Sequence, residues 1–215
     1  MKTLDLKKQY KHLYQPSAKN VEIIQVPPLQ FAMIDGAIEK GSEPGKSPSY
    51  AEATQALYGL SYTLKFMQKK RKMNPVDYPV MPLEGRWWVE DSMFDIKVKD
   101  NWFYTLMILQ PEEITQDIFA EGIEQVRKKK GDLEALSHVR LANFEEGLCM
   151  QTMHIGPYAI EPGTIERMRT FATENGYQDR VGLLGGKHHE IYLGDPRKTD
   201  PAKLKTVLRH PVAKI

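Results

Sequence analysis

Polar residues 187–190 are followed by the largely apolar residues 191–193 and a Gly-Asp-Pro turn, and we interpret this segment as a short β-strand. Because successive side chains of a strand point to opposite faces, one face carries His188, Glu190 and Tyr192. The opposite face carries His189, Ile191 and Leu193, which can pack on a core. Glutamate is depleted in strands, so Glu190 either faces solvent or anchors a ligand in a cavity. The strand pattern alone leaves both interpretations open.

A long helix is predicted after a loop rich in glycine, proline and serine at residues 41–48. The segment from Ser49 to Glu52 has the form of a capping box. Apolar residues then recur at spacings of three and four, which predicts a stripe that faces the core: Tyr50, Ala53, Leu57, Leu60, Leu64 and Met67. A second row consists of Tyr58, Tyr62 and Phe66. Such a row usually belongs to the core, but its rings could also line a cavity beside the helix.

Three more helices are predicted further along the chain. Proline suits the first position of a helix and glycine the position after its end, so one helix runs from Pro111 to Gly131. Another spans roughly residues 162–175, and a short final helix begins at Asp200 and continues to about Val207.

Strand-like segments fill the remaining chain. They cover residues 21–38, with a break at Pro27-Pro28, then residues 78–89, 95–109 and 139–155, with turns over residues 90–93 and 145–147. Trp87 and Trp88 are adjacent and must therefore face opposite sides of their strand. This order of strands and helices predicts an α+β fold with an antiparallel sheet.

Composition excludes some classes of partner. The chain has 215 residues, and its net charge of +2 gives no signature of a polyanion-binding protein. The basic runs at residues 69–72 and 128–130 fall at predicted helix ends, where cations suit the helix dipole. No apolar run approaches the length of a membrane span. We therefore expect a cytoplasmic protein without a nucleic-acid or membrane partner, and we leave its oligomeric state open.

Motifs for cofactors and metals are missing from the sequence. There is no P-loop, dinucleotide fingerprint, zincin motif or nucleophile elbow. The glycines of residues 182–186 lack the Lys-Ser/Thr of a phosphate cradle and predict a mobile connection. His188 and His189 face opposite ways, and the single cysteine, Cys149, lies in an apolar segment typical of a core. We expect no cofactor and no metal site.

Aromatic residues gather close to the one plausible carboxylate, Glu190. They are Tyr58, Tyr62, Phe66, Trp87, Trp88, Trp102, Phe103, Tyr104, Tyr158 and Tyr192. Aromatic walls around an acid suit flat, apolar or cationic ligands, which bind by stacking and cation–π contacts.

The second half of the chain resembles the GyrI-like small-molecule-binding family. The resemblance is carried by residues 146–158, Glu161-Pro162, residues 175–177, residues 188–197 and residues 205–212. It implies two β-α-β-β repeats related by a pseudo-two-fold axis, with a ligand groove between them into which Glu190 points. Residues 1–20 would be an N-terminal extension and residues 21–215 a single domain. The first repeat would span about residues 21–110 and the second about residues 139–195.

The resemblance also implies a function. In multidrug-sensing regulators this module is fused to a DNA-binding domain, for which residues 1–20 are too short, so we expect a stand-alone protein. A stand-alone subfamily hydrolyses cyclopropane-bearing DNA-alkylating natural products inside an aromatic cage. Non-catalytic sequestration of flat or cationic drugs, or interaction with gyrase, remain alternatives.

A hydrolase of that kind would divide the site residues by role. Glu190 would orient or deprotonate water, and Tyr158 or Tyr192 would donate a hydroxyl proton. Contacts to a hydrophobic aromatic ligand are predicted for Trp87, Trp88, Tyr62, Phe103, His154, His188 and Met150.

Overall fold

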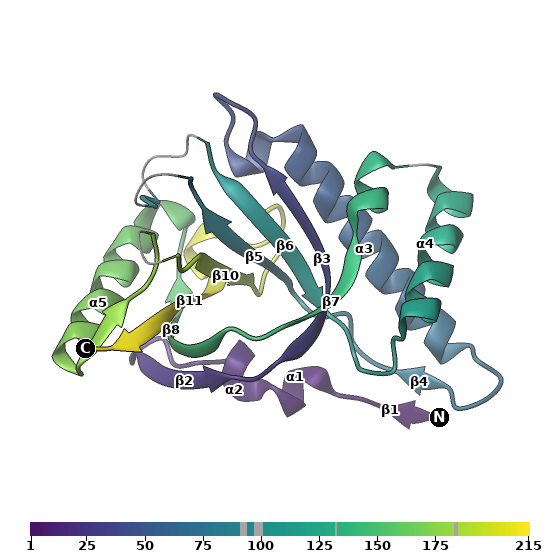
Figure 1. The fold of residues 1–215 in the computed structure, drawn as a ribbon, viewed down its shortest axis with the longest axis horizontal. Coiled ribbons are helices and arrows are strands. Elements are labelled where there is room, and N and C mark those ends of the chain that lie inside the picture. The colour runs from purple at the N-terminus through teal and green to yellow at the C-terminus, as the bar shows by residue number, and fades with distance from the viewer. Residues whose placement is uncertain (91–93, 97–100, 132, 183–184) are drawn as a thin grey trace.

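An antiparallel sheet of nine strands dominates the computed structural model, which describes residues 1–90, 94–96, 101–131, 133–182 and 185–215 (Figure 1). Eight strands are hydrogen-bonded in the order β2-β8-β11-β10-β5-β6-β3-β7, and β9 pairs with β11. Their bounds are β2 (Glu22–Val26), β3 (Leu29–Ala37), β5 (Leu83–Trp88), β6 (Phe103–Leu109), β7 (Arg140–Phe144), β8 (Gly147–Ile155), β9 (Tyr177–Asp179), β10 (His188–Tyr192) and β11 (Lys205–Lys214). The predicted α+β class with an antiparallel sheet is confirmed.

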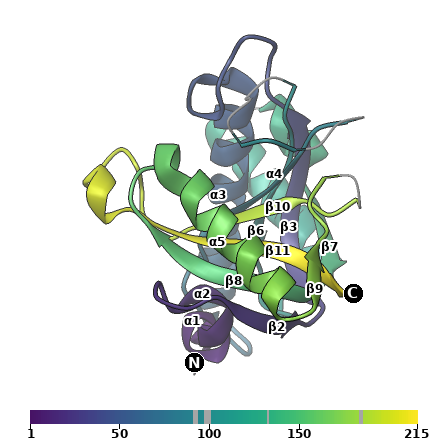
Figure 2. The same cartoon turned by 90° about the vertical axis from the view of Figure 1, so that its left-hand side faces the viewer.

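Two long helices lie over the two halves of the sheet (Figure 2). Helix α3 packs on β3 and β6, and α5 packs on β8 and β9. Helix α4 packs beside α3. The remaining elements are small. The helices are α1 (Leu6–Gln9), α2 (Lys11–Tyr14), α3 (Pro48–Lys69), α4 (Gln116–Lys130) and α5 (Glu161–Glu174). Strands β1 (Lys2–Thr3) and β4 (Val76–Asp77) form a parallel pair. Short 3₁₀ turns lie at Pro44–Lys46, Glu134–His138, Tyr158–Ile160 and Pro201–Lys203.

Helices α3 and α5 cover the same face of the sheet. Tyr50 of α3 stacks on Trp87 of β5, and Met168 of α5 clusters with Met150 of β8. Trp87 lies opposite His188 of β10, and in the same row across the sheet His210 of β11 lies opposite Met150 of β8. Residues opposite one another on paired strands point to the same side of the sheet, so Trp87 and Met150 share one face. We call it the helical face. Strands β10 and β5 lie between the two helices on this face, at the middle of the strand order.

The opposite face contacts the N-terminal segment, and we call it the N-terminal face. Leu13 and Tyr14 of α2 are buried. The hydroxyl of Tyr14 donates to Glu84 of β5, and the carbonyl of Leu13 accepts from Arg209 of β11. Residues 11–14 therefore pack directly on the centre of the sheet.

The stripe predicted on α3 is confirmed as core. Ala53, Leu57, Leu60 and Leu64 are fully buried. Of the predicted second row only Tyr58 packs against the core, since Tyr62 is 50% and Phe66 48% exposed. Each residue turns about 100° around a helix, so Tyr62, two residues after Leu60, lies on the far side from the core.

Two helix starts differ from the sequence prediction because other side chains cap them. Helix α3 begins at Pro48, where the Oγ of Ser47, rather than a box at Ser49, accepts a 3.1 Å hydrogen bond from the Tyr50 N–H. Helix α4 begins five residues after Pro111 and is capped by Thr115. The predicted C-cap at Gly131 is confirmed by its φ of 82°.

The predicted final helix is wrong. Only Pro201–Lys203 form a 3₁₀ turn, capped by Asp200, and Lys205–Lys214 form β11. This strand pairs with β10 on one side and β8 on the other. A short apolar run such as Val207-Leu208 has no periodicity that separates helix from strand, and here sheet pairing decides.

Other boundaries shift less. Strands β5 and β6 begin later than the predicted residues 78 and 95. The predicted turn over residues 90–93 and the connection over residues 182–186 lie in part outside the described residues, at 91–93 and 183–184. Among the helices that are described, none combines the length and hydrophobicity needed to cross a bilayer. Cys149 is buried as predicted.

The α3 stripe supplies a stability prediction. Leu57→Ala should lower the free energy of unfolding by about 2–5 kcal/mol, because a fully buried leucine leaves a cavity. Urea denaturation measures this, and Gln55→Ala, at an exposed position on the same helix, is the control. A change of less than about 0.5 kcal/mol at Leu57 would contradict the packing described.

Candidate functional site

Glu190 lies at the middle of β10, on the helical face, and is 6% exposed. Its partner on β5 is Gly85. A Cβ at Gly85 would stand 2.8 Å from Nε1 of Trp87 and 3.0 Å from the hydroxyl of Tyr192. The missing side chain therefore gives Trp87 the space to donate a 3.0 Å hydrogen bond to Tyr192 beside the carboxylate.

Three phenols surround this carboxylate. The Tyr192 hydroxyl donates to Glu190, and burial together with the Glu190 charge raises the pKa of Tyr192 well above its usual value. Burial and the same charge also raise the pKa values of Tyr50 and Tyr158. All three phenols therefore remain protonated donors at physiological pH. All three side chains retain partial solvent exposure.

Aromatic rings extend from the phenols along the helical face. The ring of Tyr50 stacks on Trp87 with centroids 5.7 Å apart, and Trp87 contacts Trp102 at 5.4 Å. Phe94 lies 4.8 Å from Trp102 and stacks on the imidazole of His188 at 5.3 Å. This row gives one side of the carboxylate a continuous aromatic boundary.

A chain of hydrogen bonds leads away from Glu190 on its other side. Nε2 of His188 lies 2.8 Å from Oε1 of Glu190, and Nδ1 of His188 lies 2.7 Å from Nε2 of His210. Nδ1 of His210 lies 2.9 Å from Oδ2 of Asp179. Asp179 also accepts from Nε of Arg169 on α5 at 3.1 Å. Both imidazoles are fully buried.

The number of protons in this chain is constrained. Each of the three contacts between Glu190, His188, His210 and Asp179 needs one proton. Two neutral imidazoles supply only two, so a third proton resides on an imidazole or on Glu190. Burial would raise the pKa of Asp179, but His210, backbone and Arg169 contacts lower it to about 2. Burial lowers the pKa of His188. Because Asp179 stays ionised, the third proton is held by the His188, His210 and Glu190 part of the chain.

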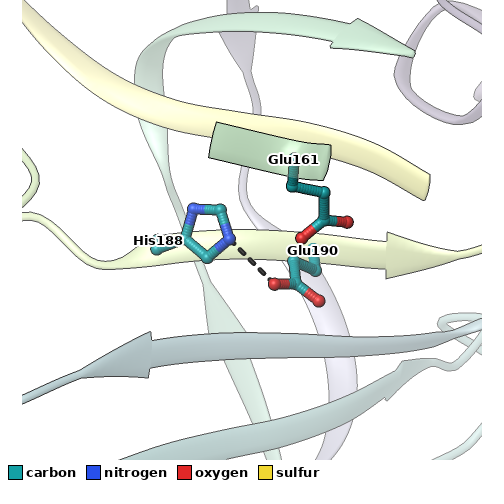
Figure 3. Close-up of side chains that lie close together, drawn as sticks. All are labelled: Glu161, His188 and Glu190. Atoms are coloured by element: carbon teal, nitrogen blue, oxygen red, sulfur yellow. Dashed lines mark hydrogen bonds and ion pairs between the residues drawn. The ribbon is translucent and has the colours of Figure 1, made fainter. Parts of the chain in front are cut away.

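Glu161, at the start of α5, adds a second carboxylate to the site (Figure 3). One ligand atom each from Glu161, His188 and Glu190 lies within 4.8 Å of the others, and all three residues are buried. Their oxygen and nitrogen atoms are of the types that bind a divalent cation. The 2.8 Å hydrogen bond between His188 and Glu190 uses two of these atoms. The sequence prediction of no metal site did not foresee this grouping.

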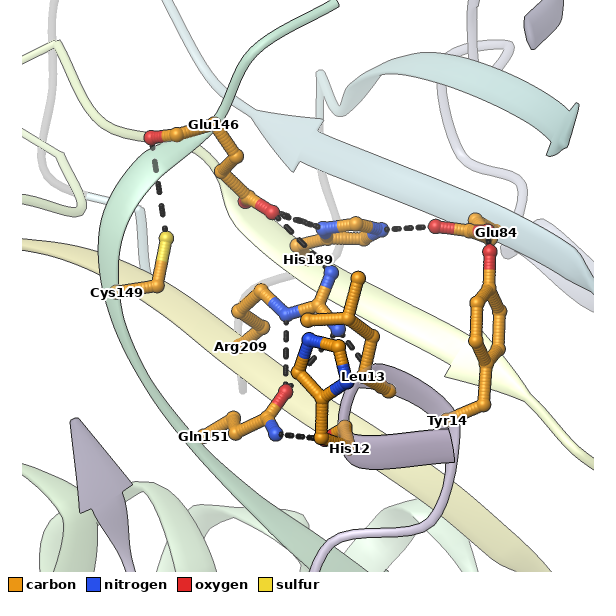
Figure 4. Close-up of polar contacts among 9 residues, drawn as sticks. All are labelled: His12, Leu13, Tyr14, Glu84, Glu146, Cys149, Gln151, His189 and Arg209. Carbon is orange, nitrogen blue, oxygen red and sulfur yellow. Dashed lines mark hydrogen bonds and ion pairs between the residues drawn. The ribbon is translucent and has the colours of Figure 1, made fainter. Parts of the chain in front are cut away.

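The N-terminal face of the same strand carries a second buried network (Figure 4). Nδ1 of His189 lies 2.9 Å from Glu146 and Nε2 lies 3.1 Å from Glu84. Because both ring nitrogens face carboxylates, His189 is an imidazolium that donates to both. Arg209 lies 3.4 Å from Glu146. The sequence predicted that this face packs on a core, and His189 is indeed buried, but among charges rather than apolar groups.

The structure brings together five of the predicted site residues. Glu190, His188, Tyr158, Tyr192 and Trp87 lie around one point of the helical face. Trp87 and Trp88 face opposite sides, as predicted, and the buried Trp87 is the one beside Glu190.

Four other predicted ligand contacts lie apart from Glu190, whereas His154 lies close enough for the Glu190 charge to act on it, although burial has the larger effect and lowers the pKa of His154. Trp88 and Phe103 stack on each other on the N-terminal face. Met150 packs under α5, and Nδ1 of His154 bonds the Thr164 hydroxyl of that helix at 2.9 Å. Tyr62 stacks on Tyr58 at the surface.

Several residues of the site were not assigned to it by the sequence. They are Tyr50, Phe94, Glu161, Asp179 and His210. His210 carried a usable signal, because residues 206, 208 and 210 share a face once the segment is a strand. The sequence analysis predicted no strand over these residues and so assigned His210 no face. Two surface cavities, of about 750 and 890 Å³, lie elsewhere and include neither Glu190 nor His188.

Comparison with known proteins identifies relatives of nearly full length. The GyrI-like small molecule binding domain matches residues 19–213. A solved structure of an uncharacterized conserved protein from Listeria innocua is 41% identical, with a TM-score of 0.87, over 98% of this chain and 100% of that one. A structure described as a hydrolase from Listeria innocua is 39% identical, with a TM-score of 0.82, over 98% and 100% of the two chains.

More distant structures share only the fold. The EcmrR C-terminal domain has a TM-score of 0.52 and 9% identity, over 91% of this chain and 98% of that one. No curated protein sequence matches the chain.

The His189 network predicts how stability depends on pH. Burial lowers the pKa of His189. The charges of Glu146 and Glu84 and their hydrogen bonds to the ring together have a larger effect and raise this pKa above 6.5. Its contribution to the free energy of unfolding is therefore complete below pH 6.5 and is lost as pH rises through the higher folded-state pKa. Urea unfolding should show His189→Gln to be most destabilising at about pH 6 and less so at about pH 9. His138→Gln, at an exposed position, is the control, and a pH-independent difference would disprove the paired imidazolium.

The hydrogen-bonded chain makes a separate prediction. Asp179→Asn removes the negative charge next to His210, so the His188–His210 pair should lose its third proton at lower pH. Imidazole ¹⁵N chemical shifts followed through a pH titration measure this. Asp117→Asn, at an exposed position on α4, should leave the titration unchanged. Identical titrations in wild type and Asp179→Asn would remove Asp179 from the chain.

Proposed function

The chain belongs to the GyrI-like small-molecule-binding family, and on this premise we propose that it is a hydrolase that opens the activated cyclopropane ring of a flat aromatic compound. The observation that carries the proposal is the carboxylate of Glu190, buried among three phenols and joined to a hydrogen-bonded histidine pair. A binding site without chemistry needs no such proton acceptor. The hydrolase description of a relative 39% identical over nearly the whole chain supports catalysis.

The aromatic residues of the helical face support a flat ligand. Tyr50, Trp87 and Tyr158 present partly or fully buried rings beside Glu190. Rings of this kind bind planar conjugated molecules by stacking, and a nearby acid orients one polar group of the ligand. We place the ligand over β5 and β10, between α3 and α5.

An internal repeat would explain why the site lies there. The segment β3-α3-β5-β6 has the same order of elements as β8-α5-β10-β11. In the sheet, β5 and β10 are neighbours at the centre. The order continues from β5 to β6 and β3 on one side, and from β10 to β11 and β8 on the other. This arrangement supports a pseudo-two-fold axis between β5 and β10, and the ligand would sit on the junction of the two repeats.

The proposed reaction adds one water molecule. In such compounds the cyclopropane is conjugated to a dienone. A phenol, Tyr158 or Tyr192, donates to the dienone carbonyl, and Glu190 takes a proton from water as its oxygen attacks the strained ring carbon. The ring C–C bond breaks, its electron pair passes into the dienone, and the carbonyl oxygen becomes a phenol. The new C–O bond leaves an alcohol on the opened ring.

His188 supports the repeated use of Glu190. A carboxylate that has taken a proton must release it before the next turnover. It returns that proton to the phenolate of the tyrosine that protonated the dienone oxygen, which restores both groups, while the 2.8 Å contact with His188 holds the Glu190 carboxylate in place. Glu161 is close enough to help position the water.

Incubation with a duocarmycin-type cyclopropanoid tests the proposal. Mass spectrometry should show a product heavier by one water, formed faster than in buffer. Glu190→Gln should lower the rate by about 10²–10⁴-fold, the usual contribution of a general base. Tyr192→Phe should also slow turnover, because it removes the hydroxyl that contacts both Glu190 and Trp87. Glu166→Gln, an exposed acid of α5, is the matched control.

Other outcomes separate the alternative functions. Absence of acceleration over buffer would reject the hydrolase. Saturable quenching of tryptophan fluorescence with an unchanged ligand would instead indicate sequestration. Capture of a gyrase subunit, independent of any small molecule, would indicate an interaction protein.

A further inference from the structure

Two cations on the N-terminal face, opposite the Glu190 site, have no acidic partner within the described part of the chain. They are Arg86 of β5 and Lys187, next to the start of β10. Among the residues that the structure describes, no carboxylate lies within ion-pair distance of either one, and Nε of Arg86 is buried without a hydrogen-bond partner. A buried N–H group without an acceptor is costly, so its retention at Arg86 needs an explanation.

Aromatic rings hold both cations in place. The guanidinium carbon of Arg86 lies 4.0 Å from the centre of the Phe144 ring, and Nζ of Lys187 lies 3.1 Å from that of Trp88. Phe103 stacks on Trp88 at 5.9 Å and supports it. Cation–π contacts fix the position of a charge but leave its N–H groups available to an acceptor.

The acids whose charges reach these cations already have partners. Asp35 pairs with Arg140 at 2.9 Å and accepts from Thr105 at 2.7 Å. Glu146 pairs with His189 at 2.9 Å and also with Arg209. The local charge therefore stays positive. Burial and the charge of Arg86 accordingly lower the pKa of Lys187 to about 8.

The spacing of the two cations suits one bridging anion. Arg86 pairs with His189, and His188 pairs with Trp87, so Lys187 comes opposite Trp88 and diagonal to Arg86. Diagonal positions on neighbouring strands are about 7–8 Å apart at their Cα atoms, within reach of two long side chains that meet at one ligand. Both cations are partly exposed, so a dissolved anion can reach them.

We propose that Arg86 and Lys187 form a binding site for a phosphate group on the face of the sheet opposite Glu190. A tetrahedral oxyanion offers separate oxygens to both cations, and the fork of an arginine together with a lysine point charge is a combination suited to phosphate. The group binds either as inorganic phosphate or as the monoester of a larger molecule. This site is independent of the hydrolase activity proposed above, because its ligand binds on the other face.

Calorimetric titration with inorganic phosphate and with phenyl phosphate, in a buffer free of other oxyanions, tests the site. Both probes should bind with one site per chain. Similar affinities would identify free phosphate as the ligand, and tighter binding of phenyl phosphate a monoester. Arg86→Gln and Lys187→Gln should each weaken binding about tenfold or more, because each removes a charge-assisted contact. Lys46→Gln, which removes an exposed lysine that pairs with Glu43, should leave the affinity unchanged.

Thermal unfolding in the absence of phosphate establishes that each variant is folded. Arg86→Lys offers a second variant that keeps the charge, and it should retain more affinity than Arg86→Gln. The proposal would be overturned if neither probe produced heat of binding. It would also be overturned if wild type, Arg86→Gln and Lys187→Gln bound the probes with equal affinity. Since the readout is binding without turnover, failure of the hydrolase assay would not affect it.

Discussion

The central strand β10 buries ionisable side chains on both of its faces, and this constraint organises the rest of the molecule. A buried carboxylate or imidazole is tolerated only with hydrogen-bonding partners. Glu190 and His188 obtain theirs from Tyr192 and from His210 on the helical face. His189, one residue away, obtains its partners from Glu84 and Glu146 on the other face. Neighbouring strands and the N-terminal segment are therefore positioned by polar contacts as well as by apolar packing.

The two networks differ in what they can do. In the network around His189, charges alternate and each is matched: His189 lies between two acids, and Arg209 adds a second cation to Glu146. Such a network holds its side chains, and the strands that carry them, in one arrangement. On the helical face, the contacts from Glu190 to Asp179 share a third proton among four groups and meet aromatic rings with partial exposure. Groups that can exchange a proton in this way are suited to chemistry.

The sequence predicted the fold class, the α3 core stripe and the opposite orientation of Trp87 and Trp88, because these follow from local periodicity. It also placed His188, Glu190 and Tyr192 on one face by strand alternation. It could not place Asp179 or His210, since their approach depends on the pairing of β9 and β10 with β11, contacts that span 22 to 31 residues. The first residues of β11 were themselves assigned to a helix that ended near Val207, because a short apolar run does not separate helix from strand and only pairing on both sides decides.

The packing of α2 has a consequence for where the folding unit begins. The family match starts at residue 19, but the carbonyls of His12 and Leu13 accept from Gln151 and Arg209, and the Tyr14 hydroxyl reaches Glu84. These contacts satisfy side chains at the very centre of the sheet. A chain trimmed to the matched region would lack these contacts, and water would then reach the buried charges of the N-terminal face. In this protein the family match therefore begins later in the chain than the packed structure does.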